Sequence, residues 1–255
     1  MLPENRSTTI QSFRDFFPSH VAAFASDRTF DFHLPADPPF LNQIQTEFLS
    51  RQLGFELPEI SNIRQVHGSR VLIAGQDPMR GKNHSLPEAD GLMTDVIGLP
   101  LAIRTADCLS VFLYDAGHDA IGLLHAGWRG AQKRIITEAL NLMKARWGTD
   151  PGRVKAALGP AIRPCCYEVG EELTQYFPGE TVSLQDRYYL DLPLAGQKEL
   201  LAGGVRNENI FDCGICTSCD KEYFSYRRDG EKAGRMIALM MLKPDPGRKR
   251  RRTLP

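Results

Sequence analysis

Long apolar runs, repeats and cysteines are scarce in this sequence, and each scarcity excludes a class of protein. No stretch approaches the roughly 18 consecutive apolar residues of a membrane-spanning helix, and the N-terminus lacks the apolar core of a secretory signal. Six cysteines in 255 residues are too few for a small disulfide-stapled scaffold. Because no repeat or linker divides the chain, we expect one domain over residues 1–247. Because a secretory signal and a membrane-spanning run are lacking, we expect this domain to be cytoplasmic and to have no membrane partner.

An excess of one charge is also missing, since 31 basic residues balance 31 acidic ones. Five of the basic residues form the run at 248–252, so that 26 basic and 31 acidic residues remain in the rest of the chain. Proteins that bind nucleic acid carry a basic stripe on their folded surface. We therefore expect no nucleic-acid partner and interpret residues 248–255 as a disordered basic tail.

The order of apolar patterns predicts an α+β fold. Apolar side chains three to four positions apart predict helices at residues 41–54 and 135–148, each ending at a glycine. Short apolar runs bounded by Gly, Asp and Pro predict strands at residues 63–73, 99–104, 109–114, 120–124, 154–158 and 236–242. Two further short helices are expected at residues 169–177 and 192–202. Strands that follow one another directly exclude a purely parallel sheet.

Three of the predicted strand ends carry one side chain that suits zinc: His67, Cys108 and His125. Imidazole and thiolate are preferred zinc ligands, and three protein ligands with one open position form the catalytic arrangement. Spacing alone does not bring these residues together. The alternative is that both histidines are hydrogen-bonded and that the cysteine is a small buried apolar residue.

The motifs around these residues resemble the multicopper polyphenol oxidase or laccase-domain family, whose members are also known as YfiH-like proteins and peptidoglycan editing factors. The resemblance covers residues 63–242 and rests on six motifs in order: RQVHG, EADGLMTD, RTADCLSVFLYD, LLHAGWRG, LGPAIRPCCYEVG and YFSYRRDG. It implies a layered α/β/β/α sandwich with mixed, mainly antiparallel sheets. It also implies that His67, Cys108 and His125 bind Zn²⁺. Copper is less expected, because a multicopper oxidase needs more histidines than the six present here.

The resemblance further implies a zinc-dependent purine nucleoside phosphorylase with adenosine deaminase activity, which takes phosphate and nucleosides of the adenosine, inosine, guanosine and methylthioadenosine class. The residues supply one candidate phosphate site, because Gly127, Arg129 and Gly130 directly precede a predicted helix. We therefore predict that Arg129 binds substrate and assists catalysis. The alternative is a plain glycine turn with a surface arginine.

Three more residues are candidates for the site. Arg227 and Arg228 are predicted to bind the anionic or ribosyl part of a substrate, although an arginine pair beside Asp229 also suits a surface salt bridge. Asp107, next to Cys108, is predicted to assist catalysis by moving protons or orienting ligands. A carboxylate that caps a turn is the alternative.

Three other functions stay open at this point. Cys108 activated by His67 or His125 would serve a cysteine hydrolase, and the family's second label suggests a hydrolase that edits peptidoglycan precursors. A non-enzymatic binding or scaffold protein is the third. It draws weight from residues 25–33, where family members usually carry a glycine pair that this chain lacks. That departure bears on substrate recognition more than on metal binding.

A second cysteine motif, Cys213-x-x-Cys216-x-x-Cys219, offers three thiolates. A tetrahedral metal site needs a fourth ligand, and the nearest spare thiols are Cys165 and Cys166. The family pattern has a cysteine at the position of Cys216 and shows no cluster. Free thiols are therefore the favoured prediction for these cysteines.

Overall fold

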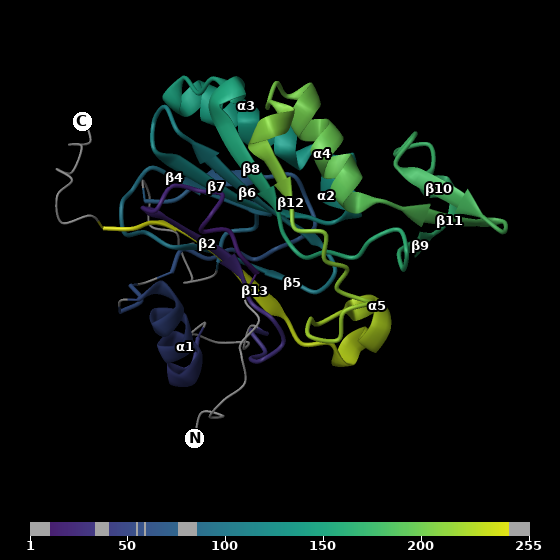
Figure 1. Cartoon of the computed structure of the whole chain (residues 1–255), viewed down its shortest axis with the longest axis horizontal. Coiled ribbons are helices and arrows are strands. Elements are labelled where there is room, and N and C mark those ends of the chain that lie inside the picture. The colour runs from purple at the N-terminus through teal and green to yellow at the C-terminus, as the bar shows by residue number, and fades with distance from the viewer. Residues whose placement is uncertain (1–10, 34–40, 55, 59, 76–85, 245–255) are drawn as a thin grey trace.

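The computed structural model describes residues 11–33, 41–54, 56–58, 60–75 and 86–244. Two large β-sheets pack face to face, and helices cover the outer face of each sheet (Figure 1). The expected α/β/β/α sandwich is confirmed. The predicted tail at 248–255 lies outside the described residues. None of the helices that the structure describes has the length and apolar character needed to cross a membrane.

The larger sheet has six strands in the order β12-β8-β6-β7-β4-β3. Its four central strands pair antiparallel, and each edge strand pairs parallel with its neighbour. The strands are β3 (Val71–Ile73), β4 (Gly91–Thr94), β6 (Leu109–Asp115), β7 (Ala120–Ala126), β8 (Val154–Leu158) and β12 (Ile210–Asp212).

The smaller of the two packed sheets has four antiparallel strands in the order β1-β2-β13-β5. These are β1 (Gln11–Ser12), β2 (Val21–Ala25), β5 (Leu101–Thr105) and β13 (Met236–Leu242). Strand β13 is apolar throughout because both of its faces are buried: Ile237 and Leu239 face the core under α1, whereas Ala238 and Met240 face the other sheet.

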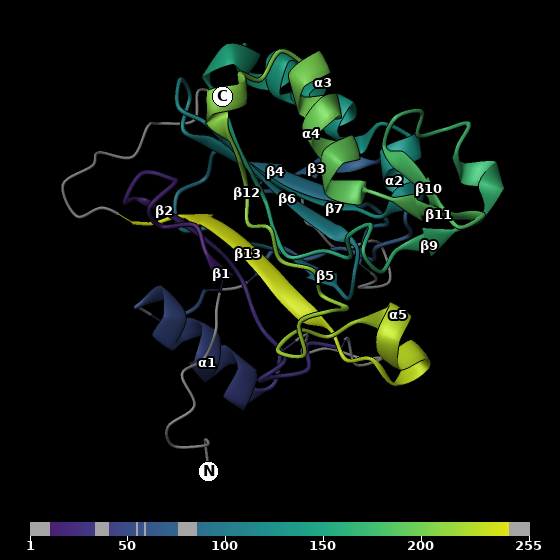
Figure 2. The same ribbon diagram turned by 45° about the vertical axis from the view of Figure 1, so that its right-hand side comes forward.

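The helices are α1 (Gln43–Leu53), α2 (Trp128–Gln132), α3 (Ile135–Trp147), α4 (Leu192–Ala202) and α5 (Tyr226–Asp229). Short 3₁₀ turns lie at η1 (Pro151–Arg153), η2 (Glu171–Leu173), η3 (Asn207–Asn209) and η4 (Gly230–Lys232). Helices α3 and α4 cover the six-stranded sheet, and α1 lies on the opposite side of the sandwich (Figures 1 and 2). Successive side chains of β6 point to opposite faces of the sheet, so Val111 packs under α3 and Phe112 packs between the two sheets.

A small sheet in the order β10-β11-β9 projects from the body (Figure 2). It consists of β9 (Glu168–Val169), β10 (Thr181–Leu184) and β11 (Arg187–Leu190). The helix predicted over residues 169–177 is therefore wrong, because Glu168 and Val169 pair with β11 and only a 3₁₀ turn follows. The apolar residues of that segment, Leu173 and Phe177, instead reach the core under α4 as a turn.

The strand predicted over residues 63–73 is mostly a loop, and only its last three residues form β3. Isolated bridges at Ser61 and Arg64 replace a continuous ladder. The chain turns at His67, which has a left-handed φ of 57°. That turn carries the imidazole toward the ends of β6 and β7, which a straight strand would not do.

Candidate metal centre and cavity

The structure brings His67, Cys108 and His125 together, with their ligand atoms within 4.8 Å of one another. Cys108 directly precedes β6, and His125 lies near the end of β7. These strands are hydrogen-bonded neighbours, with Ser110 opposite His125, so the sheet register itself places the thiol beside the imidazole. His67 approaches from its loop, and its ring centroid lies 4.9 Å from that of His125.

Asp90, at the start of β4, holds both histidine segments and is fully buried. Its Oδ1 accepts hydrogen bonds from the backbone N–H of His67 and from Nδ1 of His125, each at 2.9 Å. Its Oδ2 accepts from the backbone N–H of Gly68 at 2.6 Å. With Nδ1 bonded to the carboxylate, His125 has Nε2 free to act as a ligand, as in carboxylate–histidine–metal arrangements.

The surroundings of the three ligands fit a metal ion. A Cβ atom at Gly127 would lie 2.9 Å from Sγ of Cys108 and 3.3 Å from Cδ2 of His67, so only glycine leaves the two side chains room to converge. Two imidazoles and one thiolate form a donor set that zinc accepts, and all three side chains line the cavity described below. The group can therefore hold a metal ion.

The charges around Cys108 favour its thiolate. Burial by itself raises the pKa of the Cys108 thiol, but His125 and His67 beside the sulfur lower that pKa to about 6. Burial by itself lowers the pKa of His125, but Cys108 and Asp90 raise it to about 9. The thiolate is the form that binds a metal and also the form that acts as a nucleophile, so this electrostatic setting serves either chemistry.

The three ligands lie at a cavity of about 630 Å³. Its walls carry far more positive than negative charge, because one acid, Asp107, faces five arginines: Arg64, Arg104, Arg129, Arg227 and Arg235. Aromatic and apolar side chains complete the lining, among them Trp128, Ile162, Tyr167 and Leu192. A cavity of this kind suits a ligand with a flat apolar part and an anionic part.

Arg129 lines the cavity but not in the way that the sequence predicts. The long helix does not begin after Gly130: the five-residue α2 begins at Trp128, and α3 begins only at Ile135, after Arg134 with a φ of 62°. So short a helix has little dipole to offer an anion. Gly130 has a packing role, since its Cβ would lie 2.9 Å from the carbonyl oxygen of Gly68. The anion-binding group that this segment still offers is the guanidinium of Arg129, whose Cζ lies 4.2 Å from the centroid of the Trp128 ring.

Asp107 and Arg227 act as a connected pair at the cavity wall. Oδ1 of Asp107 accepts from the Thr217 hydroxyl, and Oδ2 accepts from the backbone N–H of Arg227, both at 2.6 Å. The Arg227 guanidinium lies 5.2 Å from the ring centroid of Tyr167. Both carboxylate oxygens of Asp107 are thus engaged in holding the wall in place.

Arg228 is not among the residues that line the cavity. Its guanidinium pairs with Asp229 and donates to the carbonyl oxygens of Thr217 and Tyr223 at 3.0 and 2.7 Å. This arginine folds the segment around α5. The two arginines of the motif therefore have different surroundings: Arg227 lines the cavity, whereas Arg228 bonds to backbone carbonyl oxygens around α5.

Comparison with known proteins accounts for this arrangement. Residues 37–243 match the family model described as multi-copper polyphenol oxidoreductase laccase. The chain belongs to this family. A purine nucleoside phosphorylase from Deinococcus radiodurans is 37% identical over 199 residues, which span 76% of this chain and 74% of that protein. A protein named purine nucleoside phosphorylase YlmD from Geobacillus stearothermophilus is 35% identical over 206 residues, 75% of either chain.

Other relatives of this laccase-family chain widen the comparison. A protein named adenosine deaminase RL5, from an unknown prokaryotic organism, is 32% identical over 201 residues, 73% of this chain and 76% of that protein. The crystal structure of Bacillus licheniformis hypothetical protein YfiH superposes with a TM-score of 0.82 at 26% identity and covers 93% of this chain and 97% of that one. The family fold is therefore present nearly from end to end.

Asp90 and Arg104 are among the site residues of this family member that the sequence patterns do not predict. Asp90 stands in the quoted EADGLMTD motif, and a lone acid at a strand start was the available signal. Arg104 is buried, donating through Nε to the Phe32 carbonyl oxygen and through Nη1 to Asn62 at 2.8 and 2.9 Å. Burial lowers the pKa of Arg104 to about 10, which leaves it cationic at neutral pH.

The divergent segment at residues 25–33 also belongs to the cavity. The carbonyl oxygen of Phe32 holds Arg104, and His33 lines the cavity wall. Phe32 itself is buried in the core under α1. The segment that departs from the expected family pattern therefore still contacts the site.

Proposed function

We propose that the protein is a zinc-dependent purine nucleoside phosphorylase with adenosine deaminase activity, acting in the cytoplasm on nucleosides of the adenosine, inosine, guanosine and methylthioadenosine class. One observation carries the proposal: three zinc-type ligands open onto an arginine-rich cavity of about 630 Å³. The relatives named for phosphorolysis and for adenosine deamination support it.

Zinc fits the site better than copper does. Among the described residues, the groups that can hold an ion are this trio and a cluster of four cysteines. A multicopper oxidase needs several imidazole-rich copper sites, and His20 and His118 are instead hydrogen-bonded to Asp119 and Asp115. When bound, zinc supplies Lewis acidity at the open coordination position, which suits addition of water to an electron-poor purine carbon.

The arginines would serve phosphorolysis. In that reaction a phosphate oxygen bonds to C1′ of the ribose, the bond from C1′ to the purine nitrogen breaks, and the base leaves after gaining a proton. Arg129 and Arg227 line the cavity and would bind the phosphate, and their charges would offset its negative charge as it approaches the sugar. Asp107 positions Arg227 through the backbone, which is the catalytic contribution that we assign to it.

The aromatic wall would serve both activities. Burial raises the pKa of Tyr167, so its phenol stays protonated and can donate a hydrogen bond. Trp128, held by the stacked Arg129, offers a flat surface of the size of a purine. In deamination the oxygen of water replaces the amino group at C6, and ammonia leaves.

The test is to incubate metal-analysed protein with adenosine, with and without phosphate, and to separate the products by chromatography. We expect adenine and ribose 1-phosphate only when phosphate is present, and inosine under both conditions. No turnover of any purine nucleoside by protein that carries zinc at the trio would contradict the proposal. It would then favour the peptidoglycan-precursor editing hydrolase or a binding role, which remain alternatives.

A cysteine hydrolase is the second candidate, and the lowered pKa of Cys108 favours it. Metal ligation and nucleophilic attack compete for the same sulfur. Iodoacetamide distinguishes them: slow labelling of Cys108 in zinc-containing protein and fast labelling after chelation support the metal role. Fast labelling while the zinc stays bound would support the hydrolase.

A further inference from the structure

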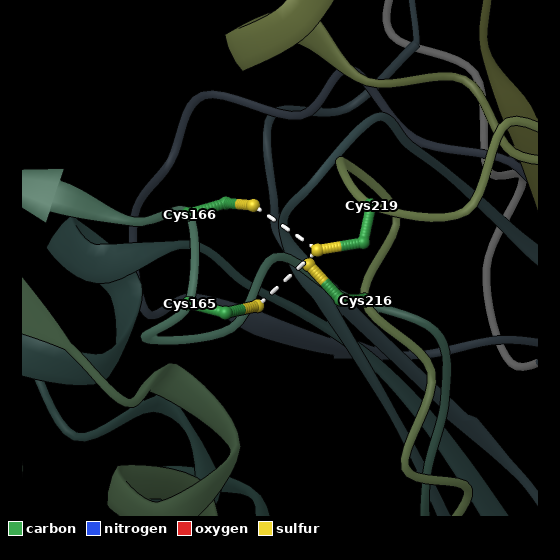
Figure 3. Close-up of side chains that lie close together, drawn as sticks. All are labelled: Cys165, Cys166, Cys216 and Cys219. Atoms are coloured by element: carbon green, nitrogen blue, oxygen red, sulfur yellow. Dashed lines mark hydrogen bonds between the residues drawn. The ribbon is translucent and has the colours of Figure 1, made fainter.

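Four cysteines outside the cavity meet at one point, although the sequence favours free thiols for them. The sulfurs of Cys165, Cys166, Cys216 and Cys219 all lie within 4.8 Å of one another. Figure 3 shows the four side chains pointing inward from two separate segments of the chain. Sγ of Cys219 lies 3.4 Å from that of Cys165 and 3.2 Å from that of Cys166.

The backbone, and not the side chains alone, brings these sulfurs together. Strand β12 runs parallel to β8, and a bridge between Ala161 and Cys216 continues their pairing beyond the strands. The N–H of Ala161 donates to the carbonyl oxygen of Ile215, and the N–H of Thr217 donates back to Ala161, at 3.3 and 3.1 Å. Because parallel strands end at the same edge, the loops that follow them lie side by side.

Each loop then turns tightly to present two sulfurs. The N–H of Cys166 donates to the carbonyl oxygen of Arg163 at 2.9 Å, and the N–H of Asp220 donates to that of Cys216 at 2.9 Å. The second turn has the spacing Cys-x-x-Cys, which is common in closed zinc sites. Cys213, the third cysteine of the sequence motif, is not in the cluster and packs against the core between the sheets.

The sulfur positions suit a single ion better than a disulfide. A disulfide holds its sulfurs about 2.05 Å apart, whereas a tetrahedral ion with zinc–sulfur bonds of about 2.3 Å holds them about 3.8 Å apart. Cys219 is near two sulfurs at once and could bond to only one of them.

The geometry points to a second metal site in which Cys165, Cys166, Cys216 and Cys219 bind one zinc ion and tie the loop after β8 to the loop after β12. Four thiolates close the coordination shell, so this ion would be structural. It is independent of the ion proposed for His67, Cys108 and His125.

The two cysteine-bearing loops are hydrogen-bonded to residues of the cavity wall. Thr217, inside the Cys-x-x-Cys turn, donates to Asp107, and the Arg227 guanidinium donates to the carbonyl oxygen of Cys166 at 3.3 Å. Arg228 donates to the carbonyl oxygens of Thr217 and Ser218. The cluster therefore supports the wall that carries Asp107 and Arg227, and a bound ion would hold both of its sides at once.

Metal counting tests the site. Protein is purified under reducing conditions, and the number of zinc ions per chain is measured by inductively coupled plasma mass spectrometry. We expect two ions in the unaltered chain, one in Cys216→Ser, one in Cys219→Ser and two in the control Cys213→Ala. We also expect His67→Asn to keep the cysteine-bound ion, which separates this proposal from the one for the cavity. A single ion in the unaltered chain that is lost in His67→Asn, or two ions retained in both serine variants, would overturn the proposal.

A second measurement covers the case in which the serine variants do not fold. An organomercurial is titrated into the unaltered zinc-loaded protein while a coloured chelator reports the zinc released. We expect two ions to be released as thiols are consumed, and six free thiols after denaturation without reductant. Release of one ion only from a protein whose His67→Asn variant binds none, or a count of four thiols that shows a disulfide, would refute the second site.

Discussion

The two cysteine-containing clusters of this protein share a sheet edge but differ in ligand number and in access. The cluster of His67, Cys108 and His125 has three ligands and opens onto a large cavity. The four-cysteine cluster has a full set of sulfurs, two of them exposed, and none of its cysteines lines that cavity. Three ligands with an open position suit chemistry, and four suit a fixed structure. Ligand count and surroundings, not the presence of cysteine, therefore separate the two roles.

Loss of a cavity ligand is expected to have the largest effect. We choose His67→Asn because asparagine tolerates the left-handed backbone at this position. Lewis-acid stabilisation contributes several kcal/mol, so we expect nucleoside turnover to fall by about 10³-fold. The measurement is steady-state kinetics with zinc analysis, with His20→Asn as the control. Turnover within a few fold of the unaltered protein would show that the trio is not the reaction centre.

Loss of the four-cysteine cluster is expected to act on stability instead. An ion present at about 100 times its dissociation constant stabilises the folded state by about 2.7 kcal/mol, which corresponds to roughly 5–10 °C in Tm for a chain of this size. We therefore expect Cys216→Ser to lower Tm by about that amount and Cys213→Ala, which lies outside the cluster, to change it much less. Calorimetry with Cys213→Ala as the matched control decides this. Equal Tm values for Cys216→Ser and Cys213→Ala would remove the distinction between the clusters.

Asp90→Asn probes how firmly the cavity ligands are held. The substitution removes the charge that orients His125 and leaves one acceptor oxygen in place of two, whereas Oδ1 now accepts from His67 and His125 and Oδ2 from Gly68. Partners of this kind change metal affinity by about 10- to 100-fold when they are altered. Chelator competition in a Cys216→Ser background measures the trio alone, with Asp95→Asn as the control. Unchanged zinc affinity would mean that the histidines are positioned without the carboxylate.

Arg129→Ala is expected to have the smallest effect. Hydrogen bonds to charged groups contribute about 1.5–3 kcal/mol, and the exposed position of Arg129 favours the lower end, so we expect KM for phosphate to rise by about 10-fold. Adenosine deamination, which uses no phosphate, is the internal control and should change little. Arg129→Lys keeps the charge but loses the planar fork, so its KM for phosphate should lie between those of the unaltered protein and of Arg129→Ala. An unchanged KM for phosphate would exclude Arg129 from the phosphate site.

Much of the fold follows from local patterns. Helices α1, α3 and α4 and strands β5, β6, β7, β8 and β13 lie where apolar periodicity predicts them, because each element buries one or both faces and must repeat accordingly. The strand predicted at residues 63–73 and the helix predicted at residues 169–177 are wrong for the same reason. Their apolar residues serve turns that enter a core contributed by distant strands, and no periodicity records such turns.

The family, the layered fold and the three candidate metal ligands at the cavity can be predicted from the sequence, because each candidate stands in a motif of adjacent residues. Which other residues join them depends on the tertiary structure. Asp90 reaches His125 across the pairing of β4 and β7, and Arg104 reaches the carbonyl oxygen of Phe32, 72 residues away. The cysteines at 165 and 166 meet those at 216 and 219 through the parallel register of β8 and β12. Contacts between distant segments depend on strand order and register, which spacing along the chain does not record.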